Sequence, residues 1–139
     1  MRKLIALTLG ALLAAAQACG PTREIVTGAS ESCTRSGSAG VCEGRFAKLS
    51  GTFDEVVQAP GCHTNVAVAV EVLASVESGS LRVLTIGPDA MEYTAEASPG
   101  RPASLTGAAA GCLNEFHVVF AAEQGEATGV KYTIRYNMP

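Results

Sequence analysis

The chain has 139 residues, of which 47% are hydrophobic, and 10 Lys and Arg against 13 Asp and Glu give a formal net charge of −3. This acidic balance excludes a protein built to bind nucleic acid, because Lys and Arg must neutralise the phosphates. The length is that of a single domain with a modest core.

An export signal is the first predicted element. Two basic residues precede residues 4–16, which carry no charge, and this is the order of segments in a signal peptide. A membrane-spanning helix needs about 20 apolar residues, more than this run provides. Ala16 and Ala18 have the spacing of small residues that signal peptidase reads. We therefore expect residues 1–18 to be a cleaved signal peptide.

The segment AAAQAC, which ends at Cys19, resembles a bacterial lipobox, although Ala16 stands where that family usually has leucine. The resemblance implies that Cys19 is acylated, begins the mature chain and anchors it to a membrane. Gly20 resembles the residue that follows the cysteine in outer-membrane lipoproteins of Gram-negative bacteria. The alternative is an ordinary signal-peptidase cut, which gives a secreted or periplasmic soluble protein. A chain beginning at Cys19 has a net charge of −5 and no basic patch, so its acyl chains would hold it to the membrane.

The number of cysteines agrees with acylation. An odd number is awkward for an exported protein, and the chain has five: Cys19, Cys33, Cys42, Cys62 and Cys112. Acylation of Cys19 leaves four, enough for two disulfides. We expect Cys33–Cys42 and Cys62–Cys112, while the two other pairings remain open. The rival interpretation is that Cys19 stays free and links two molecules.

Residues 19–44 are predicted to contain the lipid-attachment cysteine, a flexible spacer and a disulfide-bracketed loop. The stretch TGASESCTRSGSAGVCEG is rich in Gly and Ser and shows no helical or strand period, apart from a short strand at 24–27. Cys33 and Cys42 are close enough in sequence to staple a hairpin-like loop.

The pattern changes at Arg45, and residues 45–139 are predicted to form an all-β domain. Apolar and polar residues alternate clearly in VAVAVEVLASV, EFHVVFAAE and VKYTIRY, which is typical of half-buried antiparallel strands. LRVLTIG is predicted to be buried on both faces, and GTFDEVVQ, AMEYTAEA and PASLTG are weaker candidates. Gly and Pro turns separate the strands, and EQGEATG is predicted to be the loop before the last one. About seven or eight such strands make an antiparallel β-sandwich or jelly roll.

The end of the chain, GAAAGCLNEFHVVFAAEQGEATGVKYTIRYN, resembles the final hairpin of bacterial prepeptidase C-terminal-type domains. SGSLRVLTIGPDAMEYT would be the middle strand pair, so the resemblance covers about residues 50–139. The acidic signature of that family is blurred here into Asp89, Glu92 and Tyr93. The resemblance implies a jelly roll and carries no function with it.

No catalytic or cofactor motif is present in the sequence. It has no nucleophile-elbow, zinc-protease or nucleotide-binding pattern, and we expect no cofactor. His63 and His117 lack a second imidazole at ligand spacing. Asp54 and Glu55 are adjacent, so a strand would point them to opposite faces, and we interpret both as solvated charges. No catalytic residue is therefore predicted.

Two ligand sites are weakly indicated. Asp89 and Glu92 are the candidate metal ligands, because a loop could offer their oxygens to calcium. Phe46, Phe53 and Tyr93 are the aromatics left over for a sugar platform once the strand cores are filled.

The sequence favours a non-enzymatic envelope lipoprotein whose β-sandwich binds another envelope protein or has a structural role. The alternative is a secreted or anchored module that binds a glycan or calcium. A hydrolase is a distant third hypothesis, and it would depend on His117 or on Asp54 and Glu55.

Overall fold

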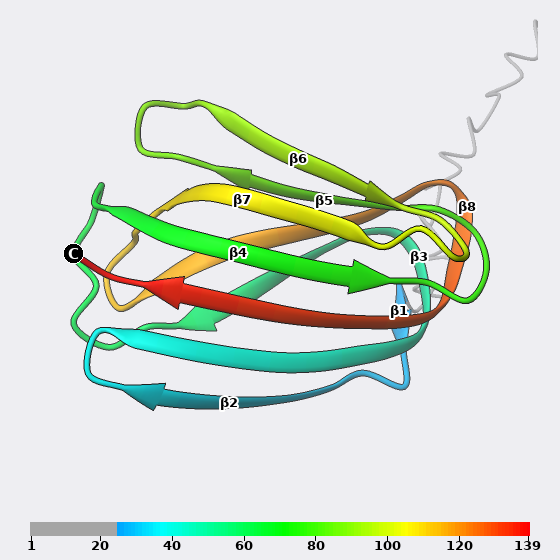
Figure 1. Ribbon diagram of the computed structural model, residues 1–139, viewed down its shortest axis with the longest axis horizontal. Coiled ribbons are helices and arrows are strands. Elements are labelled where there is room, and N and C mark those ends of the chain that lie inside the picture. Colours follow the sequence, from blue (N-terminus) through cyan, green and yellow to red (C-terminus); the bar gives the residue numbers. More distant parts are fainter. Residues whose placement is uncertain (1–24) are drawn as a thin grey trace, which may run out of the picture.

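The computed structural model describes residues 25–139, so the predicted export signal and Cys19 lie outside the described residues. These residues form an antiparallel fold of eight strands joined by turns (Figure 1). Within this range no helix is long and apolar enough to cross a membrane.

The strands follow one another with short connections. They are β1 (Val26–Thr27), β2 (Ser30–Ser36), β3 (Ala39–Gln58), β4 (Ala67–Ser75), β5 (Leu81–Ile86), β6 (Glu92–Ala97), β7 (Ala103–Ala110) and β8 (Glu115–Asn137).

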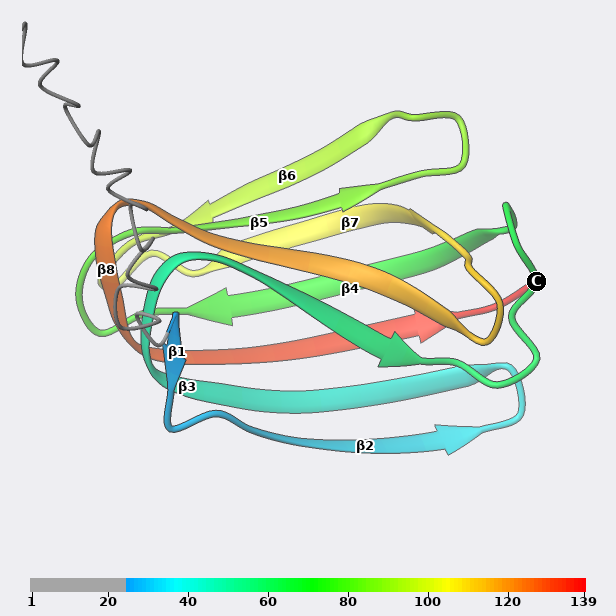
Figure 2. The same cartoon turned by 180° about the vertical axis from the view of Figure 1, so that it is seen from behind.

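The two longest strands, β3 and β8, pair along almost their whole lengths and bend together. The register shifts between Ser50 and Gly51, and this irregularity divides both strands into halves. At this point Gly51 has a φ of 82°, a left-handed backbone conformation that glycine adopts without steric cost. Figures 1 and 2 show both strands turning over at one end of the molecule.

The bend produces two facing layers. The first layer contains β2, residues 39–50 of β3, residues 126–137 of β8, β4 and β7. The second layer contains residues 51–58 of β3, residues 115–122 of β8, β5 and β6. The architecture is therefore an antiparallel β-sandwich, and the predicted fold class is confirmed.

Side chains from both layers fill the space between them. The predicted alternation is confirmed in β4, where Val68, Val70 and Val72 are buried while Glu71 is exposed. The last half of β8 follows the same rule, with these core residues: Val130, Tyr132, Ile134 and Tyr136. Four aromatic rings, those of Phe46, Phe53, Phe120 and Tyr132, meet in the middle of the core with centroids 4.7–5.7 Å apart.

The spacer and loop predicted for residues 19–44 is wrong from Ser30 onwards. Residues 30–36 and 39–44 are strand, and β1 occupies part of the predicted strand at 24–27. All seven residues of β2 are exposed, so neither of its faces carries the apolar residues that give a period of two. A strand at the edge of a sheet needs no such pattern.

Two further strand predictions need correction. EQGEATG is not a loop between strands, because β8 continues through it from Glu115 to Asn137. LRVLTIG is buried on one face only: Leu81, Val83 and Thr85 are buried, whereas Ile86 is 46% exposed. The first error arises because a bent strand and a Gly-rich loop share the same composition, and the second because apolar residues on both faces of a strand do not show which face is covered.

Candidate functional site

The β2–β3 hairpin forms one margin of the first layer. Ser36 pairs with Ala39, so the turn has two residues, Gly37 and Ser38. Gly37 has a φ of 61°, the left-handed conformation that a tight hairpin turn requires at its first position. A disulfide joins Cys33 to Cys42, which are directly opposite in the register, and this pairing was predicted.

The outer edge of β2 has no strand beside it among residues 25–139, because β2 pairs with β3 alone. The Cα atoms of Cys33 and Cys42 are 4.1 Å apart, the short spacing of a pair that exchanges no backbone hydrogen bonds. The N–H and C=O groups of Cys33 therefore point away from β3. Because this orientation alternates along a strand, Glu31 and Arg35 present their backbone groups to the same open edge.

Two tyrosine rings lie across glycines on the inner side of this hairpin. Tyr132 and Tyr136 of β8 are opposite Gly44 and Gly40 of β3. A Cβ atom on Gly44 would come within 2.1 Å of the Tyr132 ring, and one on Gly40 within 2.3 Å of Tyr136. The absence of side chains on β3 thus lets each ring extend over that strand, and the hydroxyl of Tyr132 reaches β2.

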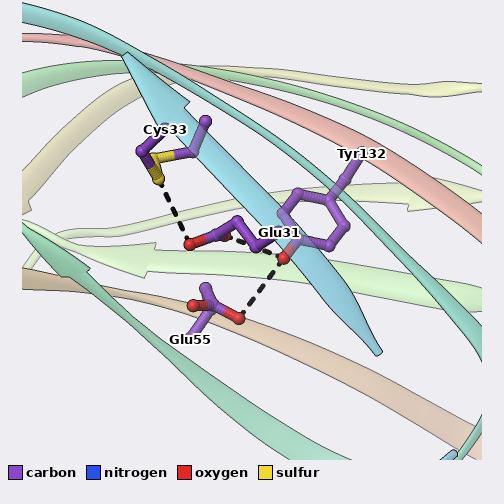
Figure 3. Close-up of a disulfide and its surroundings, with 5 residues drawn as sticks. Glu31, Cys33, Glu55 and Tyr132 are labelled. Carbon is purple, nitrogen blue, oxygen red and sulfur yellow. Dashed lines mark hydrogen bonds between the residues drawn. A yellow bond between two sulfur atoms is a disulfide. The ribbon is translucent and has the colours of Figure 1, made fainter. Parts of the chain in front are cut away.

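Two carboxylates converge on that hydroxyl (Figure 3). The Tyr132 oxygen lies 2.8 Å from Oε2 of Glu31 on β2 and 3.3 Å from Oε2 of Glu55 on β3. Oε1 of Glu31 lies 3.3 Å from the Cys33 sulfur, which is oxidised and donates no proton. Glu31, Glu55 and Tyr132 form what we call the carboxylate cluster.

The surroundings change the proton affinity of this cluster. Burial raises the pKa of Glu55 to about 7, and the negative charge of Glu31 contributes next, while the hydrogen bond from Tyr132 lowers it. Burial and the two carboxylates raise the pKa of Tyr132, so its hydroxyl stays a donor. One hydroxyl proton serves two acceptors, and a proton on Glu55 relieves their mutual repulsion.

Asp54 and His117 meet on the opposite face of the second layer. Oδ2 of Asp54 is 2.8 Å from Nδ1 of His117, and Oε1 of Glu115 is 3.7 Å from Nε2. The prediction that Asp54 and Glu55 point to opposite faces is confirmed. The prediction that both are solvated is wrong for Glu55, whose carboxyl group is partly buried beside Tyr132 of β8 and Glu31 of β2. The sequence did not indicate this, because both neighbours are remote from Glu55 in the chain.

Among residues 25–139, the weak calcium candidates are not brought together with a third acidic group. Asp89 lies in the turn between β5 and β6, where its Oδ1 accepts the Met91 N–H at 3.2 Å. Glu92 begins β6, and both residues are exposed. In the described range, one group of three metal-ligating types is close enough to share an ion: Glu31, Cys33 and Cys42. Its two sulfurs are joined in the disulfide and offer no thiolate.

The second predicted disulfide, Cys62–Cys112, is not formed in the structure. Cys62 is a buried thiol and Cys112 an exposed one. The Cys62 sulfur faces the carbonyl of His63 at 3.7 Å and lies where a side chain on Gly111 would otherwise stand. The turns therefore bring the two cysteines into one region while the Cys62 side chain is directed at the backbone. His63 itself is exposed in the same turn.

The three aromatics considered for a sugar platform do not form one. Phe46 is 2% exposed, and Phe53 packs edge-on against it with ring centroids 5.1 Å apart. Tyr93 is half-buried against Gly107, where a side chain would come within 2.3 Å of its ring.

The fold defines a small antiparallel β-sandwich protein, and its likeness to solved structures is distant. An oxalate oxidase in complex with the substrate analogue glycolate has 15% sequence identity and a TM-score of 0.39, over 81% of this chain and 52% of that one. Procruciferin, an 11S globulin from Brassica napus, has 12% identity and a TM-score of 0.32, over 73% of this chain and 22% of that one. The chain thus spans about half and about a fifth of these proteins. No family model and no curated protein matches the chain.

Proposed function

We propose that this protein is a non-enzymatic lipoprotein of the bacterial envelope, anchored through Cys19, and that its β-sandwich binds another protein along the open edge of β2. The observation that carries the proposal is the edge itself: a seven-residue strand, exposed throughout, that has no strand on one side among residues 25–139.

An open edge is a template for a further strand, because main-chain groups provide the affinity and alternate side chains provide the selectivity. In β2 this edge is held in place. The Cys33–Cys42 disulfide fixes it to β3, and Arg35 donates to the carbonyl of Pro60 at 2.8 Å. A preorganised strand loses less conformational entropy on binding than a flexible one does.

The presence of the disulfide is also an argument that the protein is exported. Disulfides persist in oxidising compartments and are rare in the cytosol. An anchor at Cys19 would fix the chain a few residues before β1 and place the sandwich beside the membrane, where envelope proteins are its neighbours.

The anchor is tested by the intact mass of the mature protein from a membrane fraction. We expect a chain that begins at Cys19 and carries added acyl mass. An unacylated chain in the soluble fraction would contradict the anchored form.

The binding edge is tested by site-specific photo-cross-linking in cells, with a benzoyl-phenylalanine at Ser32 of β2. The matched control places the same group at Glu71, an exposed residue of β4 in the middle of the same layer. We expect a discrete adduct from Ser32 and none from Glu71. Equal adducts from both positions, or none from either, would show that β2 is not the binding surface.

A further inference from the structure

We infer that the partner of β2 is β2 of a second copy of this chain, paired antiparallel about a two-fold axis at Cys33, so that two first layers join into one sheet. The inference rests on the proposed binding edge and names its occupant.

The backbone of β2 selects which residues face each other across such an axis. The hairpin turn and the short Cα distance at Cys33 both place the free N–H and C=O groups on Glu31, Cys33 and Arg35. In an antiparallel pair, hydrogen-bonded residues stand directly opposite one another. These three residues must therefore pair among themselves.

One register gives the backbone groups of all three residues a hydrogen-bonding partner at once. With Cys33 on the axis, it faces its own counterpart, and Glu31 faces Arg35 of the other copy in both directions. A slip to the next hydrogen-bonded register puts Glu31 opposite Cys33 and leaves Arg35 outside the paired segment. The symmetric register is thus the one that uses every free backbone group of the three.

The side chains complement one another in the same register. Glu31 and Arg35 are exposed, carry opposite charges and project from the same face of β2, so the axis creates two opposite-charge pairs. On the other face Ser32 meets Thr34, and Ser30 meets Ser36, all small hydroxyl residues. No like charges and no large apolar groups are opposed.

Charges on an edge strand usually keep other strands away. Here the two-fold axis converts the same charges into attraction, whereas a strand that carried the two charges in the opposite order would meet like charges. The charge in β2 reverses sign about Cys33, from Glu31 to Arg35, and this self-complementary order favours a copy of the same strand over other edges.

Each of the two side chains already makes one contact within the chain. Glu31 accepts from Tyr132 through Oε2, and Arg35 donates to Pro60 through Nη1, which leaves the second oxygen and the remaining guanidinium nitrogens for the other copy. Figure 1 shows β2 along the lower margin of the molecule, where no other described strand lies outside it.

The test uses two differently tagged full-length chains expressed in the same cells, with co-purification of one tag through the other. Wild-type copies are expected to co-purify. E31R alone and R35E alone each oppose like charges and should reduce co-purification at least tenfold. E31R with R35E in the other copy, and the double variant E31R/R35E with itself, should restore it. E71R, a charge reversal on the central strand β4, should leave it unchanged.

Three results would overturn the inference: wild-type copies that do not co-purify, single reversals that co-purify as well as the wild type, or a mixed pair that fails to recover. The Cys33–Cys42 disulfide, read as a two-dalton mass change on reduction, checks that each variant has kept its hairpin. A Ser32 adduct with a different protein, together with wild-type copies that do not co-purify, would refute self-pairing and leave the proposed binding edge standing. Absence of any Ser32 adduct would refute both.

Discussion

At the scale of single residues, Glu55 shows how the fold creates chemistry that its neighbours in sequence do not suggest. Its carboxyl group faces inward from β3, half-buried, and it shares the hydroxyl of Tyr132 with Glu31. Burial and the charges of Glu31 and Asp54 oppose its ionisation, while the Tyr132 hydroxyl is the one group of the cluster that favours it. The result is an acid that titrates near neutral pH.

The first prediction concerns stability against pH. The pKa of Glu55 is about 7 in the folded state and 4.5 in the reference state, so between these values the folded protein binds more protons than the unfolded one. Its contribution to the free energy of unfolding therefore falls as pH rises from about 4.5 to 7 and stays level above. We expect E55Q to remove this decline and to gain about 1 kcal/mol over the wild type at pH 8, a value reduced for solvent screening.

Urea denaturation of the wild type and of E55Q at intervals from pH 4 to 8 measures this difference. E43Q, a change at an exposed residue of β3 whose charge is not among those that shift the pKa of Glu55, is the control for adding a neutral amide to that strand. Parallel curves for wild type and E55Q across this range would disprove the role assigned to Glu55.

The second prediction concerns the two thiols. Cys112 is exposed, whereas burial and the neighbouring Cys112 raise the pKa of Cys62 and leave less of its reactive thiolate. Without reductant, iodoacetamide should modify Cys112 first and Cys62 at least tenfold more slowly, as followed by peptide mass. If neither reacts until a reductant is added, the Cys62–Cys112 disulfide predicted from the sequence forms in the protein.

At the scale of elements, the β2–β3 hairpin depends on glycines that leave space for tyrosine rings. Alanine usually stabilises a strand relative to glycine, by about 0.5–1 kcal/mol. At Gly44 the sign should reverse, since the added methyl overlaps the Tyr132 ring. We expect G44A to cost about 1–3 kcal/mol, the usual range for overpacking.

A double-mutant cycle isolates that overlap. In a Y132L background the ring is absent, so G44A should cost at least 1 kcal/mol less than in the wild type, roughly the coupling expected of contacting residues. Chemical denaturation of the four proteins gives the coupling free energy. Additive effects would mean that Gly44 is needed for its backbone and not for the ring.

The elements differ in how far their sequences predict them. Strands such as β4 and the last half of β8 bury one face, so their alternation is visible in the chain. β2 buries neither face and was missed for that reason. The carboxylate cluster was missed because Glu31, Glu55 and Tyr132 come from three strands, and no spacing in the sequence relates them. The Cys33–Cys42 pair could be predicted because both ends lie in one hairpin.

At the scale of the whole molecule, β3 and β8 make the two layers interdependent. Each strand contributes one half to the first layer and the other half to the second. The aromatic cluster repeats this arrangement: Phe46 and Tyr132 come from the first layer, and Phe53 and Phe120 from the second. Because the rings touch across the layers, neither layer can lose its packing alone.

The last prediction follows from that shared core. Phe120 is fully buried and packs against both Phe46 and Tyr132, with centroids 5.7 and 4.7 Å away. F120A should cost about 3–5 kcal/mol, as removal of a buried aromatic ring usually does. The loss should be felt equally in both layers, although Phe120 belongs to the second. Amide hydrogen exchange measures this directly, through the slowest amides of β4 in the first layer and β5 in the second.

Equal loss of protection in β4 and β5 is the expected outcome, because these amides then exchange through one global unfolding reaction. L113A is the control, since Leu113 is 71% exposed and its truncation should change stability by less than about 0.5 kcal/mol. If F120A lowered protection in β5 alone, the layers would unfold separately and the continuity of β3 and β8 would not couple them. That result would also mean that the β2 edge, which belongs to the first layer, is supported by that layer alone.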